Sequence, residues 1–437
     1  MPHLTLPDLP KPVDAPVTDG SPERVALIGT GVRGAWTWGA ELRSQLAGTV
    51  DLVAVVDANP VRARTAAGVL GEPPVFTDVA EMLVTARPDT VIVASRDDVH
   101  VDHIVVALEA GCRVVSEKPM VTTAEACARV LEAERRTGGR IDVGFNYRHT
   151  PGFRLVKEVL AEGAIGDVVS IDFHWYLDTD HGADYFRRWH AYQARSGGLF
   201  VHKATHHFDI LNWLLGRWPD QVFATGTQAI YGPAGPFRGT SCRTCEHAGT
   251  CDFRFDMTTE PWMMALYAAA EGEDGYVRDA CVFREDIDAF DTMSATLRYG
   301  TVPVSYSLNT AMPYEGYALG INGTKGRLDL RQNERQPWPE PPVDAVHVTP
   351  LFGERETRYA AWGDGFHFGA DVPLRDLLFR PGADDPLGQR AGSADGAASV
   401  VVGIGATRSA QEGSAVNLTP LYDTAGLSEA QQVAGGR

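Results

Sequence analysis

Short runs of apolar residues recur along the first third of the chain, and turn-forming residues bound each run. Runs of this kind predict buried strands at 24–28, 51–57, 90–95, 113–117 and 141–146. Amphipathic stretches between them predict helices near 33–46, 78–86, 100–110 and 122–136. Strands that alternate with helices indicate a parallel, doubly wound α/β sheet, in which ligands lie beyond the carboxyl ends of the strands.

The pattern changes in the second half of the chain. Residues 291–310 alternate apolar and polar residues, as expected for a half-exposed antiparallel sheet. The segment "GINGTKGRLDL" predicts a strand–turn–strand with its reversal at Gly323 to Gly326. Residues 332–362, rich in Pro and Glu, are expected to be irregular.

Composition narrows the class of protein. A length of 437 residues suggests two or three domains, and a net charge of −18 argues against a nucleic-acid partner. No apolar stretch approaches the roughly 20 residues of a membrane span. Six cysteines in so long a chain favour a reducing cytoplasm. Residues 1–22, rich in Pro and Asp, predict a disordered tail.

A glycine-rich turn follows the first predicted strand. "RVALIGTGVRG" places Gly29, Gly31 and Gly34 in a G-x-G-x-x-G pattern, and Asp57 follows 23 positions after Gly34 at the end of the next strand. This arrangement is typical of dinucleotide binding, with the pyrophosphate at the helix N-terminus and the carboxylate on the adenosine ribose. Asp57 favours NAD over NADP, although Arg62 or Arg64 could bind a 2′-phosphate.

Polar segments follow the later strands of this predicted sheet: "SRDDVH" (95–100), "EKP" (117–119) and "NYRH" (146–149). Their side chains would meet at one edge of the sheet, beside the cofactor. The candidate cofactor-binding residues are Gly29, Thr30, Gly31, Val32, Arg33, Gly34, Asp57, Ser95, Arg96, His100, Glu117, Lys118 and Asn146.

Residues 197–209, "GGLFVHKATHHFD", crowd three histidines and a lysine into six positions. The residues themselves leave three interpretations open. His202 and His206 could handle protons near neutral pH, or, at i,i+4 spacing, could bind a metal on one helix face. The third interpretation is a polar helix start, with "FDILNWLLG" as its apolar face and Gly216 as its end, and we favour it for His207.

Four segments, taken in order, resemble the glucose-fructose oxidoreductase / inositol dehydrogenase / MocA (Gfo/Idh/MocA) family: "GTGVRG", "EKPM", "GFNYRHTP" and "SGGLFVHKATHHFDILNWLLG". The resemblance implies an N-terminal Rossmann domain (23–146) and a C-terminal α/β domain (147–437). The second domain would contain a large, open, mainly antiparallel sheet that often forms the oligomer interface. It also implies that Lys118 contacts the nicotinamide ribose and the substrate hydroxyl.

The family usually carries an Asp, a His four residues later and an Asp three residues beyond. His206 and Asp209 match the last two positions, and His206 is therefore the expected general base. His202 stands where the first Asp is usual, and an imidazole cannot supply the fixed negative charge of a carboxylate. Lys203 is a further candidate, either as a substrate donor or as a charge that lowers the pKa of His206.

Residues 171–195 predict a strand and then a loop that reaches the substrate, with many aromatic and charged side chains. The candidate substrate-binding residues are Arg148, Tyr176, Arg188, Trp189, Lys203 and Asp209. "GFHFGADVPLRDLLF" resembles a G-H-G-G-x-D element of one family branch at His367 and Asp371. It would either approach the active site or cap a helix at Asp371.

An insert at 236–282 contains a cysteine cluster, with Cys242, Cys245 and Cys251 in C-x₂-C-x₅-C spacing and Cys281 later. Grouped thiolates in a reducing compartment favour structural zinc, and a similar pattern occurs in one branch of the family. An iron–sulfur cluster, free thiols or a single disulfide are the alternatives.

The sequence as a whole predicts an NAD-dependent oxidoreductase acting on a secondary alcohol of a sugar, sugar acid or (amino)cyclitol. The alternatives are a redox-neutral enzyme that cleaves or epimerises sugars through a transient keto-sugar, and a non-catalytic nucleotide sensor. The presence of both Lys118 and His206 argues against the sensor. The expected partners are a small-molecule substrate and further copies of the chain, in a homodimer or homotetramer.

Overall fold

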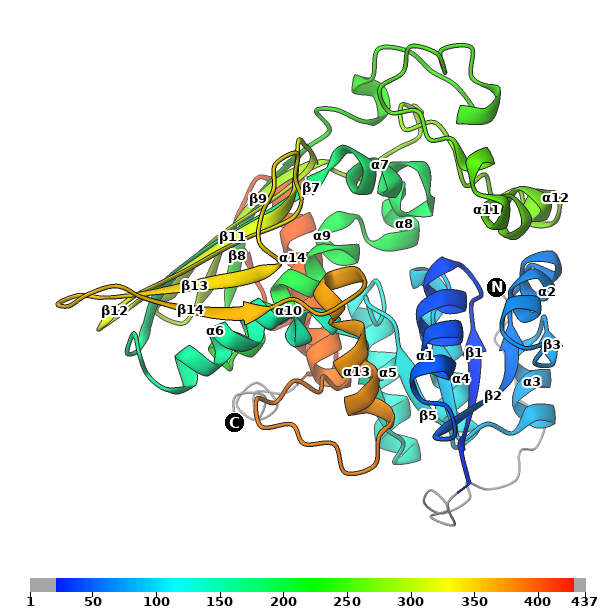
Figure 1. The fold of residues 1–437 in the computed structure, drawn as a ribbon, viewed down its shortest axis with the longest axis horizontal. Coiled ribbons are helices and arrows are strands. Elements are labelled where there is room, and N and C mark those ends of the chain that lie inside the picture. Colours follow the sequence, from blue (N-terminus) through cyan, green and yellow to red (C-terminus); the bar gives the residue numbers. More distant parts are fainter. Residues whose placement is uncertain (1–20, 428–437) are drawn as a thin grey trace.

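The computed structural model of the chain describes residues 21–427, which form two sheets with flanking helices (Figure 1). The predicted tail, apart from residues 21 and 22, lies outside the described residues.

The first sheet has six parallel strands in the order β3-β2-β1-β4-β5-β6. They are β1 (Glu23–Ile28), β2 (Val50–Val56), β3 (Val75–Phe76), β4 (Thr90–Val93), β5 (Arg113–Ser116) and β6 (Ile141–Val143). The chain changes direction across the sheet between β1 and β4, and ligands bind beyond the carboxyl ends of strands at such a point. The predicted doubly wound parallel sheet is confirmed.

The four helices predicted between these strands are present: 33–46 as the π-helix η1 (Arg33–Glu41) with α1 (Leu42–Gln45), and the others as α3 (Val79–Ala86), α4 (His100–Glu109) and α5 (Ala124–Thr137). The structure adds α2 (Pro60–Val69) and the 3₁₀ turn η2 (Asp97–Val99), which were not predicted. Asn59, Asp78 and Thr123 accept hydrogen bonds from backbone N–H groups in the first turns of α2, α3 and α5. These side-chain caps satisfy donors that lack a partner within the helix, and so fix where each helix begins.

The second sheet has nine strands in the order β14-β13-β12-β11-β7-β10-β9-β8-β15. They are β7 (Val168–Asp178), β8 (Gln221–Thr227), β9 (Thr292–Tyr299), β10 (Val302–Met312), β11 (Glu315–Gly323), β12 (Gly326–Arg335), β13 (Val343–Pro350), β14 (Glu356–Ala361) and β15 (Val416–Asn417). All neighbouring strands pair antiparallel except β7 and β10. The expected large, mainly antiparallel sheet is therefore present.

The expectation of an irregular segment at 332–362 is wrong. β12 continues to Arg335, and β13 and β14 form a hairpin at the edge of the second sheet. The alternation "VDAVHVT" buries Asp344, Val346 and Val348 on one face. Four of the five prolines in this segment lie in the connection before β13, where a ladder hydrogen bond is not needed, and Pro350 is the last residue of β13.

One face of the second sheet packs against helices (Figure 1). These helices are α6 (Pro151–Ala161), α9 (Leu199–His202), α10 (Ala204–Leu215) and α14 (Ser393–Glu412). Along β7, Phe173, Trp175 and Leu177 are buried toward this core, whereas His174 and Tyr176 alternate onto the opposite, half-exposed face. The period of two that defines a strand thus decides which side chains can reach the helices.

Residues after β7 form a helix, which corrects the predicted loop. The helix is α7 (Thr179–Arg187), followed by η4 (Trp189–Ala191) and α8 (Gln193–Ser196). The Asp178 carboxylate accepts hydrogen bonds from the N–H groups of Asp180 and His181, and this cap favours a helix in a segment whose charges suggest a loop.

Residues 228–291, between β8 and β9, form an extension that we call the arm. It contains η5 (Gly232–Ala234), η6 (Cys242–Thr244), η7 (Met257–Thr259), α11 (Pro261–Leu266), η8 (Ala268–Ala270) and α12 (Glu271–Asp274). The arm reaches from the second sheet to the first, where α11 packs on α2 (Figure 1). It therefore covers the end of the first sheet at which a nucleotide is expected.

The remaining elements connect the two sheets. They are η3 (Asn146–His149), η9 (Phe366–Gly369), α13 (Asp371–Phe379) and α15 (Thr419–Thr424). α14 contacts α5 and β6 of the first sheet as well as α10 and β8 of the second, and so packs between the two sheets. Among residues 21–427, no helix has both the length and the apolar character that a membrane span requires.

Candidate active site

The glycine-rich turn after β1 has the close backbone packing that the motif requires. Gly29 has φ +92°, and a Cβ there would lie 2.5 Å from the backbone of Ala94 and Ser95. A Cβ on Gly34 would lie 1.9 Å from the carbonyl oxygen of Gly29. At Gly31 the nearest atom to such a Cβ would be the Tyr267 hydroxyl oxygen, at 3.4 Å. The turn therefore fits the backbone approach of a dinucleotide pyrophosphate.

Asp57 orders this turn. Its Oδ2 accepts hydrogen bonds from the backbone N–H and the hydroxyl of Thr30, both at 2.9 Å, and its Oδ1 accepts one from the N–H of Asn59. Oδ1 also accepts a hydrogen bond of 3.2 Å from Arg62, so each carboxylate oxygen already accepts two hydrogen bonds. A ribose hydroxyl would therefore bind Asp57 by replacing one of these side-chain donors. Arg62 is held by Asp57 at 3.2 Å and by Asp274 at 2.8 Å.

The arm contributes aromatic residues to the nucleotide end of the first sheet. The Tyr267 hydroxyl accepts a hydrogen bond of 3.0 Å from the backbone N–H of Val32, at the start of η1. The guanidinium carbon of Arg62 lies 5.7 Å from the ring centroids of both Tyr267 and Tyr276. A single pair of aromatic side chains thus contacts both the glycine turn and the arginine beside Asp57.

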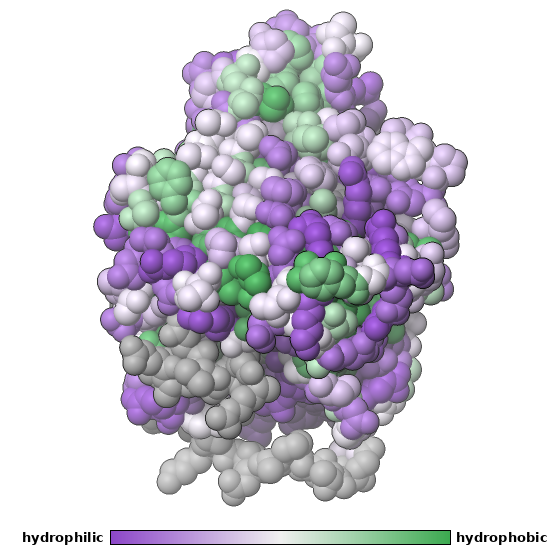
Figure 2. All heavy atoms as spheres, turned by 90° about the vertical axis from the view of Figure 1, so that its left-hand side faces the viewer, coloured by the Kyte–Doolittle hydropathy of each residue, from purple (hydrophilic) through white to green (hydrophobic). Residues whose placement is uncertain are grey.

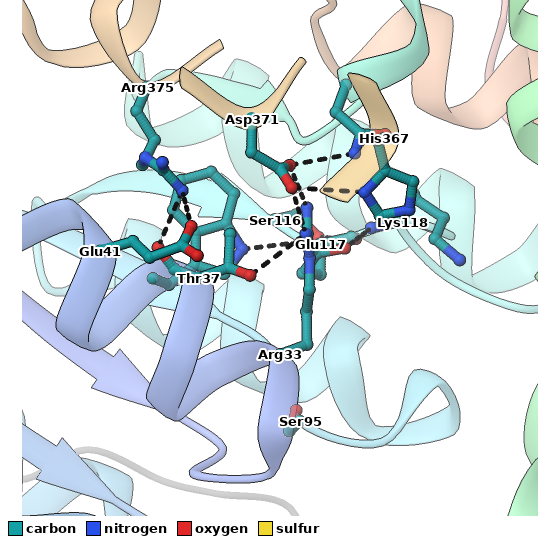
Figure 3. Close-up of polar contacts among 12 residues, drawn as sticks. Arg33, Thr37, Glu41, Ser95, Ser116, Glu117, Lys118, His367, Asp371 and Arg375 are labelled. Atoms are coloured by element: carbon teal, nitrogen blue, oxygen red, sulfur yellow. Dashed lines mark hydrogen bonds and ion pairs between the residues drawn. The ribbon is translucent and has the colours of Figure 1, made fainter. Parts of the chain in front are cut away.

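Arg33 links the first turn of η1 to the C-terminal part of the chain (Figure 3). Its guanidinium donates to Glu117 at 2.6 Å and to both oxygens of Asp371 at 3.0 and 2.9 Å. Trp38 also donates to Glu117, and Asn146 donates to Asp371. Burial alone would raise the pKa of Glu117, but the positive charges of Arg33 and Lys118 hold it below its ordinary value. Arg33, Glu117 and Asn146, predicted to bind cofactor, are here joined in one ionic network.

Lys118 lies at the carboxyl end of β5, beside the start of α10. Its Nζ donates a hydrogen bond of 3.3 Å to the backbone carbonyl of His202. Burial lowers the pKa of Lys118, and the carboxylates of Glu117 and Asp97 oppose that shift. The side chain remains partly exposed, so its ammonium is available to a ligand.

His202, at the end of α9, pairs with a residue that the sequence did not single out. Its Nδ1 lies 2.5 Å from Oδ2 of Asp97, which is only 3 % exposed. Burial and the charge of Lys118 lower the pKa of His202 well below its usual range. Asp97 was missed because it occurs among several charged residues of "SRDDVH"; its position after β4 was the signal that could have identified it.

His206 lies one helical turn after His202. Its ring is 4.4 Å from that of Tyr147, and its Nδ1 is buried without a hydrogen-bond partner. Burial lowers the pKa of His206 well below its usual range, and the charges of Lys118 and Lys203 lower it further. The imidazole is therefore neutral near neutral pH and able to accept a proton. It shares its surroundings with Lys118, as the resemblance implies.

Lys203 is almost fully buried in an aromatic environment. Its Nζ donates a hydrogen bond of 2.9 Å to the hydroxyl of Tyr147 and lies 5.1 and 5.2 Å from the ring centroids of Tyr147 and Trp175. Burial lowers the pKa of Lys203 to about 8. His207 packs in the same core, with its ring 4.1 Å from that of Trp175, which agrees with the structural interpretation favoured for it.

Four of the predicted binding residues point elsewhere. Arg148 and Asp209, proposed as separate substrate contacts, form a bidentate ion pair with each other at 2.8 and 2.6 Å, and both are buried. Tyr176 lies on the opposite face of the second sheet, and Trp175 takes its place near the site. His100, proposed as a cofactor contact, uses both ring nitrogens on the carbonyls of Pro119 and Ser95.

The remaining candidate residues lie around the site and contact neighbouring side chains. Arg188 pairs with Asp184 at 3.2 Å, and its charge lowers the pKa of Lys118. Trp189 stacks on His190 at 3.7 Å, and His190 lies 4.0 Å from His202. Two cofactor candidates have local partners: Ser95 bonds to His103, and Arg96 bonds to Asp98.

The segment at 365–371 approaches the site rather than only capping a helix. Asp371 is the first residue of α13, and its carboxylate binds Arg33 and Asn146 across the molecule. His367 and Phe368 have φ values of 53° and 57°, which non-glycine residues adopt rarely. This backbone places the His367 ring 5.6 Å from Tyr147 and its Nδ1 3.4 Å from Asp371 (Figure 3).

The cysteine cluster lies in the arm, apart from Lys118 and His206. Cys242, Cys245, Cys251 and Cys281 are free thiols that line one cavity of 20 Å³. Within residues 21–427, however, no group of three or more His, Cys, Asp or Glu side chains has an arrangement that could hold a metal ion. Neither the zinc prediction for the cysteines nor the metal interpretation of His202 and His206 is supported by this geometry.

Comparison with known proteins agrees with the fold and the motifs. Residues 23–145 match the family model described as "Oxidoreductase family, NAD-binding Rossmann fold", and residues 153–329 match the "GFO/IDH/MocA C-terminal domain". The chain belongs to the Gfo/Idh/MocA oxidoreductase family. The resemblance inferred from the four motifs is therefore confirmed, together with the NAD-binding Rossmann fold of the first part.

Similar proteins in this family are oxidoreductases. The "Putative oxidoreductase YteT" of Bacillus subtilis is 39 % identical over 403 residues, which cover 85 % of this chain and 92 % of that protein. An inositol 2-dehydrogenase of Rhizobium meliloti is 32 % identical over 216 residues, 48 % of this chain and 63 % of that protein.

Solved structures share the fold at lower identity. The WlbA dehydrogenase of Bordetella pertussis, in complex with NADH and UDP-GlcNAcA, has a TM-score of 0.63 and 19 % identity, over 91 % of this chain and 98 % of that chain. A levoglucosan dehydrogenase, in complex with NADH and levoglucosan, has a TM-score of 0.66 and 20 % identity, over 91 % of this chain and 100 % of that chain.

Proposed function

We propose that this protein transfers a hydride between NAD and a secondary alcohol of a sugar, sugar acid or (amino)cyclitol. One observation carries the proposal: the partly exposed Lys118, which follows β5 of the first sheet, lies beside the start of α10, the helix that carries the buried His206. The Lys118 ammonium donates to the carbonyl of His202, one turn before His206, and its charge lowers the pKa of His206. A fixed donor beside a neutral imidazole is the pair that alcohol oxidation requires.

In the oxidation direction, the Lys118 ammonium would donate a hydrogen bond to the substrate hydroxyl oxygen and hold it in place. His206 would accept the hydroxyl proton, because its lowered pKa keeps the imidazole unprotonated near neutral pH. NAD, when bound, supplies the acceptor for the hydride that leaves the same carbon. The products are a carbonyl group, a protonated His206 and the reduced nicotinamide, so atoms and charge balance.

The substrate class rests on the residues around this pair. Trp175 and Tyr147 stack on each other at 5.0 Å beside the Lys203 ammonium. An ammonium donor next to aromatic rings suits the hydroxyl groups and apolar faces of a sugar or cyclitol ring. The inositol 2-dehydrogenase and the levoglucosan dehydrogenase among similar proteins act on molecules of this kind by name.

We propose NAD as the cofactor in preference to NADP. Asp57 would accept the ribose hydroxyls in exchange for the Thr30 hydroxyl or Arg62, and Arg62 is already bound by Asp57 and Asp274. A 2′-phosphate in this position would therefore meet two carboxylates, while the nearest arginine is occupied.

The test is to incubate the purified protein with NAD and a panel of sugars, sugar acids and cyclitols and to follow absorbance of the reduced nicotinamide. We expect turnover on at least one polyol, a loss of about 10²–10⁴-fold in kcat for His206→Gln, and unchanged NADH binding in that variant. Glu132→Gln, in an exposed ion pair on α5, is the control and should behave as the parent. A protein that binds NADH but oxidises no polyol would contradict the proposal.

Redox-neutral chemistry through a transient keto-sugar is the second candidate. The close contact of His190 with His202, at 4.0 Å, adds neutral imidazoles to the region where a sugar would lose and regain protons. Cleavage of a glycoside without net formation of NADH would favour this candidate over simple oxidation.

Assembly through the outer face of the second sheet is also part of the proposal. This face has a groove of about 560 Å³ lined by polar side chains such as Asp172, His174 and Arg327. Figure 2, from the side of the molecule opposite the first sheet, shows hydrophilic residues interleaved with smaller hydrophobic patches. We expect a homodimer or homotetramer, and light scattering after gel filtration measures which.

A further inference from the structure

The pairing of His202 with Asp97 connects the two parts of the site. Asp97 belongs to η2, directly after β4 of the first sheet, and His202 ends α9 on the helical layer of the second. Through its ring His202 contacts the Asp97 carboxylate at 2.5 Å, and through its carbonyl it accepts the Lys118 hydrogen bond at 3.3 Å. One residue thus touches both a carboxylate and an ammonium from the first sheet.

Charge balance singles out Asp97 among the nearby carboxylates. Glu117 already accepts hydrogen bonds from Arg33 and Trp38. Asp98 pairs with Arg96 at 2.5 Å and with Arg195 at 3.0 Å. Among the contacts of residues 21–427, the ion-pair partner of Asp97 is His202 alone. Asp97 is therefore the buried carboxylate whose charge is not already balanced by an arginine.

We propose that Asp97 is the positioning carboxylate of the active site, which orients the His202 imidazole and balances the charge of the Lys118 ammonium. This inference rests on the proposed function. The Asp97–His202 contact fixes the end of α9, and α10, which carries His206, begins two residues later. Asp97 thereby sets where both the donor and the base stand, although it touches neither the substrate nor His206.

The electrostatics link Asp97 to Lys118. Burial raises the pKa of Asp97 well above its usual range and so disfavours the charged carboxylate, and among nearby charges Lys118 opposes this shift most strongly. The Lys118 ammonium is therefore the main group that favours the ionised form of Asp97. Conversely, Asp97 and Glu117 raise the pKa of Lys118, whereas burial, Arg33 and Arg188 lower it. Removing the Asp97 charge should therefore lower the pKa of Lys118.

The first test is Asp97→Asn in the full-length protein, with Asp98→Asn as the matched control. Asn keeps the size of the side chain and can still accept the His202 hydrogen bond, so the substitution removes mainly the charge. We expect kcat to fall about 10²-fold, the magnitude of a misplaced catalytic group, with NADH affinity within about twofold. The alkaline limb of the pH profile should move to lower pH, since Lys118 loses its proton more readily.

If Asp97 had only a structural role, Asp97→Asn would not shift the alkaline limb of the pH profile. Full kcat and an unshifted alkaline limb in a folded, NADH-binding Asp97→Asn variant would overturn the inference. The same change in Asp98→Asn would also overturn it, because any nearby negative charge would then suffice.

The second test does not depend on turnover. The short Asp97–His202 contact should give a far-downfield imidazole proton resonance in the NMR spectrum. We expect this signal in the parent and in Asp98→Asn, and its loss in Asp97→Asn and in His202→Gln. If the parent lacks the signal, the positioning role is wrong whatever the substrate is. A clear signal in a protein that oxidises no polyol would instead contradict only the proposed function.

A reciprocal variant covers the case in which Asp97→Asn fails to fold. The double variant Asp97→His with His202→Asp keeps one carboxylate and one imidazole in contact, with their positions exchanged. We expect it to fold and to recover at least about tenfold of the activity lost in Asp97→His alone. A folded double variant with no recovery would overturn the inference.

Discussion

The molecule buries charge in two different ways along α10, and we call the two groups of residues the paired side and the unpaired side. On one side, Arg148 and Asp209 form a bidentate pair in which each side chain satisfies the other. On the other side, Lys203 and His206 lie among aromatic rings; Lys203 donates to the Tyr147 hydroxyl, and Nδ1 of His206 has no partner. Both regions are equally inaccessible to solvent, so burial alone does not distinguish them.

The difference distinguishes buried charges that stabilise the fold from buried groups that can take part in catalysis or binding. A paired charge resists change, because removing its partner leaves an uncompensated charge in a medium of low polarity. An unpaired lysine or histidine is destabilised in its charged form, and its pKa is lowered: to about 8 for Lys203, and well below the usual range for His206. The second group is therefore ready to exchange protons or to bind a ligand, and groups with perturbed pKa values gather at functional sites for this reason.

The largest effect is expected from breaking the paired side. Asp209→Asn leaves the Arg148 guanidinium with only the partly exposed Asp395 at 3.2 Å. We expect the free energy of unfolding to fall by about 3–5 kcal/mol, measured by urea denaturation. Glu132→Gln, in the exposed pair with Arg135, should change it by less than about 0.5 kcal/mol. If Asp209→Asn instead raises KM and leaves the free energy of unfolding unchanged, Asp209 binds substrate, as the sequence predicted.

The next effect concerns the unpaired side. Lys203→Met keeps a similar volume between Tyr147 and Trp175 but removes the ammonium. We expect kcat/KM for the polyol substrate to fall by about 10²-fold, equivalent to roughly 2.7 kcal/mol, because a buried donor to the substrate is lost. Stability should stay the same or rise, which steady-state kinetics and denaturation together would establish. Destabilisation without a kinetic effect would assign Lys203 to the core.

The same lysine should make stability depend on pH. The pKa of Lys203 is about 8 in the folded protein, below the ordinary lysine value that it regains on unfolding. Below pH 8, Lys203 is protonated in both the folded and the unfolded protein, and the free-energy cost of burying its charge is fully present. Between pH 8 and the ordinary lysine pKa, Lys203 is protonated only in the unfolded protein, so this cost is lost. Stability should therefore rise by roughly 1–2 kcal/mol between pH 8 and 9.5.

Lys203→Met should flatten this rise without abolishing it, because Lys157 has a pKa lowered to about 8 as well. Denaturation midpoints at pH 7, 8 and 9.5 in parent and variant measure the difference. Parallel curves for the two proteins would show that Lys203 keeps its ordinary pKa.

The first sheet and the main site residues were predictable because their signals are local. Gly29, Gly34 and Asp57 act within one strand–turn–helix unit, and "EKP" follows the strand that delivers Lys118 to the edge of the sheet. The helix that carries His206 was likewise predictable, because Gly216 marks its end in the sequence.

Residues that depend on long-range pairing were not predictable in this way. Asp97 and His202 are 105 positions apart, and nothing near either residue indicates that they meet. Arg148 and Asp209 looked like free polar groups because each partner lies in a different element. The prediction that Tyr176 binds substrate was wrong because neighbouring residues of a strand face opposite sides of the sheet. Which of Tyr176 and Trp175 faces the site is known only once the register of β7 with β10 and β11 is known.

The smallest predicted effect tests whether paired charges can also set selectivity. Arg62 is bound by Asp57 and by Asp274 of the arm, and it lies between Tyr267 and Tyr276. In Asp274→Asn the guanidinium keeps Asp57 but loses one ion pair, so it becomes freer to bind a 2′-phosphate. We expect the ratio of NADPH to NADH affinity to rise about fivefold, roughly 1 kcal/mol, by fluorescence titration.

Asp256→Asn, which removes an exposed charge of the same arm, is the control for this change. It should leave the ratio of the two affinities as in the parent, because Asp256 pairs with Arg254 rather than with Arg62. If Asp274→Asn also leaves the ratio unchanged, Asp57 alone is responsible for selectivity. The arm would then cover the nucleotide end of the first sheet without taking part in the choice of cofactor.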